Sequence, residues 1–223
     1  MLSRPLGNVS LRLHNNLLAP QSVKLALLQI SSRPLFKNGQ YRFGENYLQD
    51  AVSKIEALRD YPLEWYSIGP LQSNKTRFIA EHFDWVLSLD QLKHAQRLNA
   101  QRSNHLPPLN VCIQVNISEE PQKSGVYLSE LPVLAQAIAD LPRLRLRGLM
   151  ALPARSDDFN QQRIPFRALR IAFQQLQASG LALDTLSMGM TGDMVAAIAE
   201  GSTLVRIGTG IFGKRIDQIV RLV

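Results

Sequence analysis

The chain has 223 residues, a length that suits one domain with a large hydrophobic core and argues against two equal domains. Apolar residues make up 45% of the sequence and charged residues 19%, which excludes a disordered chain. No apolar run approaches the ~20 residues that span a bilayer, so we expect no membrane-spanning segment.

The net charge of +7 raises the possibility of a polyanionic partner, but most basic residues are scattered along the sequence. We therefore expect no nucleic-acid partner. Residues 1–22 contain no continuous apolar block before a small-residue cleavage site, so a cytoplasmic protein is expected. Cys112 is the single cysteine, which excludes an intramolecular disulfide framework. Because it lies in an apolar run, we expect its side chain to be buried.

In chain order, residues 1–22 have no regular period and predict an N-terminal arm or a frayed helix. Residues 23–30 are almost continuously apolar, which is typical of a strand buried on both faces. Only about a dozen residues separate this strand from the next one, so the first crossover must be shortened. Strands are then predicted at 41–46, 63–68, 83–89, 109–117, 145–152, 183–187 and 204–207, and helices at 47–58, 71–80, 91–99, 128–139 and 160–178.

This alternation of strands and helices favours a parallel sheet, and eight strands favour its closure into a single-domain α/β (β/α)8 TIM barrel. The barrel would occupy residues 23–215, between the arm at 1–22 and a C-terminal tail at 216–223. An open, doubly wound sheet is the alternative fold.

Three arginines, Arg143, Arg145 and Arg147, alternate with Leu144 and Leu146. On a strand the arginines share one face and the leucines the other. We expect solvated or ion-paired arginines at the start of this strand.

Two segments near the end of the chain, residues 186–193 and 205–213, are rich in Gly, Ser and Thr, and each follows a short apolar run. Backbone N–H groups and hydroxyls in such loops bind phosphate, and the first loop leads into a helix that Thr191 or Asp193 could cap. In (β/α)8 barrels the phosphate site usually lies after strands seven and eight. These segments are therefore predicted to form phosphate-binding loops.

The residues at the carboxyl ends of the predicted strands are mostly polar, as expected for the functional face of a barrel. Glu45 is a candidate acid–base group, although the sequence suggests no second catalytic residue. The four histidines lack metal-binding spacing, and no serine lies in a Gly-x-Ser-x-Gly turn. The residues expected at this face are Ser31 or Ser32, Glu45, Asn46, Ser67 to Gly69, Asn116, Met150, Ser187 and Arg206.

Several blocks of the sequence resemble the pyridoxal phosphate homeostasis proteins, which are single-domain relatives of the alanine racemase N-terminal barrel. The resemblance runs from residue 23 to residue 215. It implies a protein that binds pyridoxal 5′-phosphate (PLP) without catalytic turnover and that buffers or delivers the cofactor inside the cell. The blocks are residues 43–47, 68–75, 114–118, 123–125 and 147–151, together with the two phosphate-binding loops.

The resemblance also implies roles for individual residues. Arg206 would face the pyridine nitrogen, and Asn46 and Met150 would line the ring. An arginine donates hydrogen bonds without giving up its proton, so it leaves that nitrogen unprotonated and the ring a poor electron sink, which suits a carrier. The phosphate would be held by Ser187, Gly208 and Thr209, with help from the backbone at Met188 and Ile207.

One departure from the family pattern concerns the lysine that forms the Schiff base, which lies in a Ser-Lys-Thr-Lys-Pro type motif after the first strand. Here the segment reads Ser-Ser-Arg-Pro, and Ser32 stands in place of that lysine. A serine cannot form an imine. Without this bond we expect weak, reversible PLP binding, at best with a dissociation constant of about 1 μM. Three other lysines are candidates to form the Schiff base in its place: Lys37, Lys75 and Lys123. For each of them we expect a solvated position on the surface instead.

A second departure is Trp65-Tyr66-Ser67, where the family has His-Phe after the tryptophan.

From these sequence features we expect a non-catalytic PLP-binding protein that is a monomer or a weak dimer. The alternatives are a racemase- or decarboxylase-like PLP enzyme, which would need a lysine base, and a barrel that binds only phosphate or has lost the cofactor.

Overall fold

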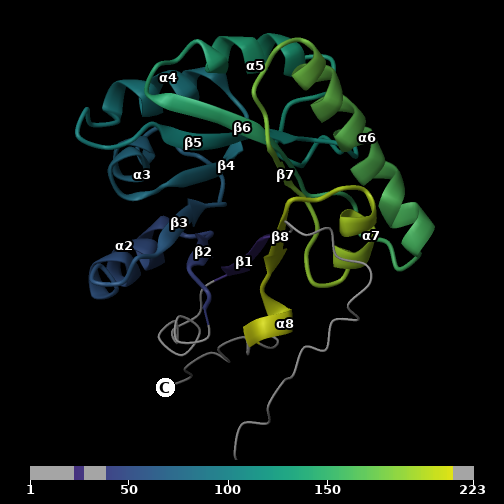
Figure 1. Ribbon diagram of the computed structural model, residues 1–223, viewed down its shortest axis with the longest axis horizontal. Coiled ribbons are helices and arrows are strands. Elements are labelled where there is room, and N and C mark those ends of the chain that lie inside the picture. The colour runs from purple at the N-terminus through teal and green to yellow at the C-terminus, as the bar shows by residue number, and fades with distance from the viewer. Residues whose placement is uncertain (1–22, 28–38, 213–223) are drawn as a thin grey trace, which may run out of the picture.

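A computed structural model of the chain describes residues 23–27 and 39–212. Its strands form a closed parallel barrel in which every strand pairs with its neighbours in the sequence (Figure 1). The ring closes where β1 pairs with β8, with Val23 opposite Leu204 and Ala26 opposite Ile207. The strands are β1 (Val23–Leu27), β2 (Arg42–Glu45), β3 (Glu64–Ser67), β4 (Trp85–Leu89), β5 (Leu109–Val115), β6 (Leu144–Ala151), β7 (Thr185–Ser187) and β8 (Leu204–Ile207).

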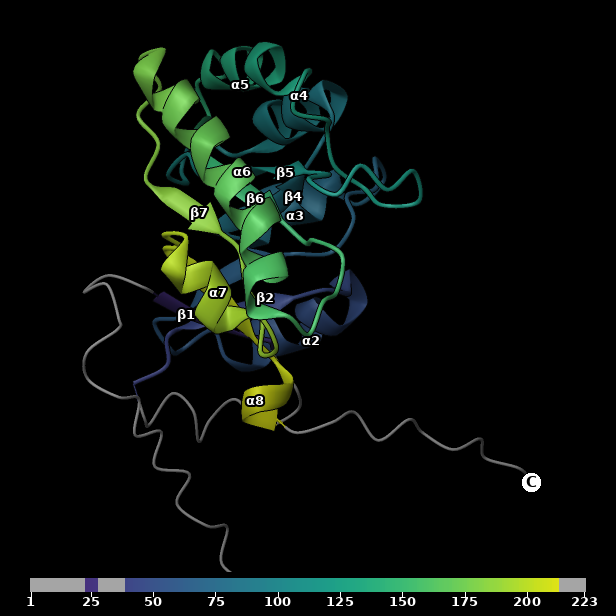
Figure 2. The same cartoon turned by 90° about the vertical axis from the view of Figure 1, so that its right-hand side faces the viewer.

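Helices follow the strands from β2 onward and surround the barrel, as Figures 1 and 2 show. This arrangement confirms the predicted (β/α)8 barrel, and closure between β1 and β8 rules out the open-sheet alternative. The described helices are α2 (Leu48–Ala57), α3 (Thr76–His82), α4 (Leu92–Gln101), α5 (Leu131–Ala139), α6 (Phe159–Ala178), α7 (Met194–Ala199) and the short α8 (Thr209–Phe212).

Two predicted helix starts were wrong. The helix expected from residue 71 begins at Thr76, because Pro70 is followed by a turn in which the Lys75 amide donates to the Gln72 carbonyl at 2.8 Å. The helix expected from residue 128 begins at Leu131, after a turn in which the Glu130 carboxylate accepts the Tyr127 amide at 3.2 Å. The predicted arm, the shortened first crossover with Ser31, Ser32 and Lys37, and the tail lie outside the described residues.

The main hydrophobic core lies between the barrel and its helices, and it contains large side chains such as Phe43, Phe83 and Phe166, each no more than 1% exposed. Burying side chains of this size contributes about 1.5–3 kcal/mol each. A second cluster, around Leu87 and Cys112, fills the barrel interior. The prediction of a buried Cys112 is confirmed, and burial raises the pKa of its thiol.

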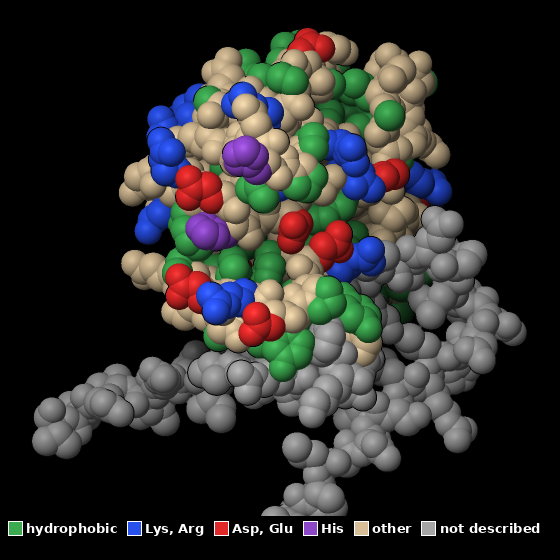
Figure 3. All heavy atoms as spheres, turned by 60° about the vertical axis from the view of Figure 1, so that its left-hand side comes forward, with side chains coloured by type: hydrophobic (Ala, Val, Ile, Leu, Met, Phe, Trp, Pro, Cys, Tyr) green, Lys and Arg blue, Asp and Glu red, His purple; other side chains and the backbone are tan. Residues whose placement is uncertain are grey.

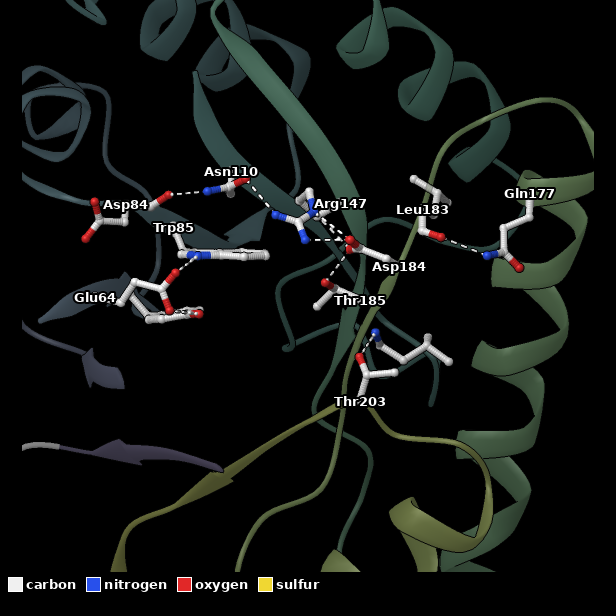
Figure 4. Close-up of polar contacts among 12 residues, drawn as sticks. Glu64, Asp84, Trp85, Asn110, Arg147, Gln177, Leu183, Asp184, Thr185 and Thr203 are labelled. Atoms are coloured by element: carbon white, nitrogen blue, oxygen red, sulfur yellow. Dashed lines mark hydrogen bonds and ion pairs between the residues drawn. The ribbon is translucent and has the colours of Figure 1, made fainter. Parts of the chain in front are cut away.

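The amino-terminal end of the barrel is closed by a stack of aromatic and charged side chains (Figure 4). The guanidinium of Arg147 lies 4.7 Å from the centre of the Trp85 ring, and Trp85 in turn stacks on Tyr66. Glu64 accepts hydrogen bonds from both aromatic residues, and Asp184 accepts two from Arg147 Nε at 2.9 and 3.0 Å. This end of the barrel is therefore filled with side chains that pair with one another.

The predicted faces of the arginine-rich strand are confirmed. Leu144 and Leu146 are buried, Arg145 is exposed, and Arg147 is ion-paired. Among the described residues, no helix is long and apolar enough to cross a bilayer.

Helix α6 is joined to the end of α7 by a cluster of charges, and the two helices lie side by side in both views (Figures 1 and 2). Glu200, only 1% exposed, accepts from Arg163 at 2.7 Å and from Arg167 at 3.0 Å, and Arg170 lies 3.4 Å away. Asp158 caps the amino-terminal end of α6, where its carboxylate accepts the Gln161 amide at 2.8 Å.

Candidate functional site

A cavity of about 250 Å³ opens at the carboxyl ends of the strands, opposite the closed end. Residues at the ends of β2, β6 and β8 reach it, together with the first turns of α2 and the loop after β7. These segments are far apart in sequence and meet because parallel strands of a barrel present their carboxyl ends at one face. The cavity is lined by Gly44, Glu45, Asn46, Tyr47, Asp50, Lys54, Ile68, Met150, Leu152, Met190 and Arg206.

Asn46, Met150 and Arg206, the three residues assigned to the pyridine ring from the sequence, lie together in this cavity. Met150 and the neighbouring side chains of Ile68 and Leu152 give it apolar surface. The cavity thus combines an apolar wall with a small number of polar groups, as small-molecule sites generally do.

Arg206 is 3% exposed and links three strands. From β8, its Nη1 donates to the Ser187 carbonyl at 2.8 Å and to the Ser187 hydroxyl at 2.6 Å, and its Nη2 donates to the Ala151 carbonyl at 2.9 Å. Burial lowers the pKa of Arg206 to about 10, while the nearby charge of Asp193 opposes the shift. The side chain is therefore still a cation at neutral pH, held in one orientation.

The two predicted phosphate-binding loops lie next to each other. The Gly210 amide donates to the Thr191 hydroxyl at 3.3 Å, which joins the loop after β8 to the loop after β7. Gly189 has φ +93° in the first loop, and an added Cβ would lie 2.5 Å from the Ala197 side chain, so this turn requires glycine. Thr209 is exposed beside the pair of loops.

Other groups in these loops are already engaged. Ser187 is fully buried, and its hydroxyl accepts a hydrogen bond from the Arg206 guanidinium. The Met188 amide donates to the Leu204 carbonyl at 3.1 Å and cannot also bind a ligand in this arrangement. Asp193 precedes α7 as expected, but its carboxylate accepts the Met190 amide at 2.5 Å and does not cap the helix.

Lys54 is a polar residue of the cavity that was not identified from the sequence. Its ammonium lies 2.7 Å from the Glu45 carboxylate, and the two side chains are 20% and 5% exposed. Tyr47, Asp50 and Lys54 follow a spacing of three and four residues, so they share the helix face that lines the cavity. This spacing could have shown from the sequence that the three residues share a helix face. It does not show that this face of α2 is turned toward the cavity.

Position 69, after β3 and beside the cavity, requires a glycine. A Cβ at this position would lie 2.0 Å from the backbone oxygen of Asn46 and 3.1 Å from its side-chain oxygen. The close approach of the two backbones fixes where Asn46 stands at the rim.

Some residues expected at the functional face do not reach this cavity. Asn116 instead holds the loop after β5, donating to the Glu120 carbonyl at 2.8 Å. Lys75 and Lys123 are not among the residues that line the cavity, and Lys123 pairs with Glu120. In the loop after β7, Met188 is buried, whereas Met190 is 39% exposed and lines the cavity.

On the face shown in Figure 3, basic and acidic side chains alternate and do not gather into one basic patch. This pattern agrees with the scattered charge of the sequence.

Comparison with known proteins gives consistent matches. The family model described as "Alanine racemase, N-terminal domain" matches residues 30–215. The pyridoxal phosphate homeostasis protein of Escherichia coli (strain K12) is 56% identical over 180 residues, which cover 79% of this chain and 77% of that protein. The protein of the same name from Pasteurella multocida is 50% identical over 206 residues, which cover 88% of each chain.

Among solved structures, PipY of Synechococcus elongatus PCC7942 is similar to this chain both without PLP and with PLP bound. The two structures superpose with TM-scores of 0.81 and 0.80 at 35% and 34% sequence identity. Each match covers 88% of this chain and 94% of PipY. The similarity therefore extends over nearly the whole barrel.

Proposed function

The chain belongs to the alanine racemase N-terminal domain family and groups there with the pyridoxal phosphate homeostasis proteins, and on this premise we propose that it binds PLP and maintains the cofactor supply in the cytoplasm without catalysing a reaction. The relatives are named for PLP homeostasis and not for a reaction. PipY, at 34% identity, has a structure with PLP bound.

One observation carries the proposal. Asn46, Met150 and Arg206, which come from three segments far apart in the sequence, line one cavity beside the two loops rich in Gly, Ser and Thr. A flat ring that ends in a phosphate ester needs an apolar wall, a few oriented donors and a cluster of donors for the phosphate. The residues present fit that group.

Arg206 would orient the ring. Among the described residues, Ser187 and Ala151 take three of the five N–H donors of its guanidinium, and the other two, at Nε and Nη2, have no described partner. Because the bonded donors hold the group in place, the remaining donors need little reorganisation when a ligand binds. When bound, PLP would supply an aldehyde and an electron-accepting ring.

The phosphate would lie against the loops that Thr191 and Gly210 join. Gly208 and Thr209 would bind it directly, together with backbone at Ile207, and Ser187 would form the buried polar floor beneath Arg206. Charge-assisted hydrogen bonds contribute about 1.5–3 kcal/mol each, so a few of them support binding near the micromolar range. The scattered surface charge supports a small-molecule ligand over nucleic acid, and we propose a monomer or weak dimer.

A titration with PLP, followed by visible absorption and by tryptophan fluorescence, tests the proposal. We expect saturable binding that inorganic phosphate weakens. Asn46→Ala should weaken binding several-fold, because Asn46 lies at the cavity, while Asn104→Ala, at an exposed loop position, should not change it. Absence of saturable binding, or equal affinity in the two variants, contradicts the proposed site. Conversion of D- or L-alanine by the PLP-loaded protein would contradict the non-catalytic role.

A further inference from the structure

The primary amine of Lys54 is placed beside the groups proposed to hold the PLP ring. Lys54 lines the same cavity as Met150 and Arg206, and its side chain is 20% exposed. Among the lysines whose side chains the structure describes, Lys54 is the one that lines this cavity.

A cavity that receives an aldehyde has a chemical use for such an amine. A primary amine forms a C=N bond with an aldehyde, whereas a guanidinium, an amide or a hydroxyl does not. The family pattern supplies the amine from the end of the first strand, where this chain has Ser32. In the part of the chain that the structure describes, the amine that reaches this cavity comes from α2.

Glu45 stands where it can move the protons that this chemistry requires. Its carboxylate is 5% exposed, lines the cavity and lies 2.7 Å from Lys54 Nζ. A carboxylate within hydrogen-bond distance of an ammonium can accept a proton from it and return that proton to another oxygen later.

We propose that Lys54 binds the aldehyde of PLP covalently and so replaces the missing lysine of the first strand, an inference that rests on the proposed function. Glu45 accepts a proton from the Lys54 ammonium, and the neutral Nζ attacks the aldehyde carbon. The carbonyl oxygen takes up two protons, one returned by Glu45 and one lost from the nitrogen. It then leaves as water while the C=N bond forms. One amine and one aldehyde give one imine and one water, and no oxidant or reductant is needed.

Borohydride reduction of the PLP-loaded protein, followed by mass mapping of peptides, tests this assignment. We expect the reduced adduct on the peptide that contains Lys54. Lys54→Arg keeps a positive charge beside Glu45 but has no primary amine, so the adduct should fall at least about tenfold. Lys75→Arg, which changes a lysine outside the cavity, is the matched control and should keep the full adduct. Circular dichroism of each variant checks the fold.

Glu45→Gln gives a second measurement that a structural ion pair would not predict. This variant keeps Lys54 but removes the proton acceptor, so the adduct should form several-fold more slowly while its position stays at Lys54. Adduct on another lysine, a full adduct in Lys54→Arg, or an unchanged rate in Glu45→Gln would each overturn the proposal.

Pyridoxine 5′-phosphate separates this inference from the proposed function, because it carries an alcohol in place of the aldehyde. We expect it to bind the wild type and Lys54→Arg with affinities that agree within about twofold. If PLP and this analogue both bind but Lys54 carries no adduct, only the covalent assignment fails. If neither binds, the proposed function fails as well.

Discussion

At the scale of single residues, Arg206 has two roles in the site. It joins the ends of three strands by hydrogen bonds, and it lines the cavity. Its planar group donates in two directions at once, to Ser187 and to Ala151. A lysine in its place would be a single point charge with a different reach.

We therefore expect Arg206→Lys to reduce stability by about 1–3 kcal/mol, since it leaves buried acceptors without a partner. PLP affinity should fall about tenfold or more, because the oriented donors are lost. Urea denaturation measures the first effect and absorption titration the second. Unchanged values for both would show that the guanidinium has no special role.

Residue 32 provides a gain-of-function test that depends only on the resemblance of the sequence. Ser32→Lys restores the family residue, and in the Lys54→Arg background, where no other described amine lines the cavity, we expect it to strengthen PLP binding by about tenfold or more through the added covalent bond. In this variant borohydride reduction should place adduct at position 32. Unchanged affinity would mean that the shortened first crossover, and not the missing amine, limits binding.

At the scale of secondary-structure elements, the strands and helices are joined by contacts that a single substitution can break. Strand β6 packs so closely on β7 that a Cβ at Gly148 would lie 1.8 Å from the Thr185 carbonyl oxygen. Helix α6 is joined to α7 through Glu200 and its arginines.

Gly148→Ala should destabilise the protein by about 2–3 kcal/mol, because backbone atoms must move to admit the methyl group. Gly180→Ala is the control. It has φ +98° but no neighbour within 4 Å of the new methyl, so we expect only the conformational cost of about 1–2 kcal/mol. Urea denaturation compares the two. An effect at Gly180 equal to or larger than that at Gly148 would contradict the account of strand packing.

The charge cluster predicts how stability depends on pH. Burial raises the pKa of the Glu200 carboxyl, but hydrogen bonds from Arg167 and Arg163 outweigh burial and hold that pKa below its ordinary value. The stabilisation is therefore complete above the unfolded pKa of ~4.3 and is lost as pH falls through the lower folded pKa.

Between about pH 6 and about pH 3, the wild type should lose more stability than Glu200→Gln, which has no carboxyl to protonate. Glu81→Gln serves as the control, because Glu81 lies on the surface, 3.9 Å from Arg77. It should follow the wild type. Parallel pH profiles for wild type and Glu200→Gln would disprove the role of the cluster.

At the scale of the whole molecule, the closed barrel separates two tasks. The amino-terminal end is filled by paired side chains such as Arg147, Trp85 and Glu64 (Figure 4), and the carboxyl end holds the cavity. Because the same strands run from one end to the other, a ligand that binds the hollow end stabilises the whole barrel.

A saturating concentration of PLP should therefore raise the melting temperature. At one hundred times the dissociation constant, binding adds about 2.7 kcal/mol, which corresponds to roughly 5–10 °C for a domain of this size. Thermal denaturation at increasing PLP concentration measures the shift, and Asn46→Ala should need more PLP to reach it. A melting temperature that does not depend on PLP concentration would contradict binding to the native barrel.

Features that depend on local pattern could be predicted from the amino-acid sequence alone. Apolar runs of strand length, alternating with helical segments, predicted the barrel. The loops around Gly189 and Gly208 and the serine at position 32 were likewise evident from neighbouring residues.

Which of these features meet in space depends on the packing of the whole barrel. Closure of the ring brings Asn46, Met150 and Arg206 to one cavity, turns the Lys54 face of α2 toward it and buries the Ser187 hydroxyl under Arg206. Sequence patterns report the period of a segment, which is local. The partner of a side chain depends on how distant segments pack, and in this barrel that packing is set by the pairing of all the strands around the ring.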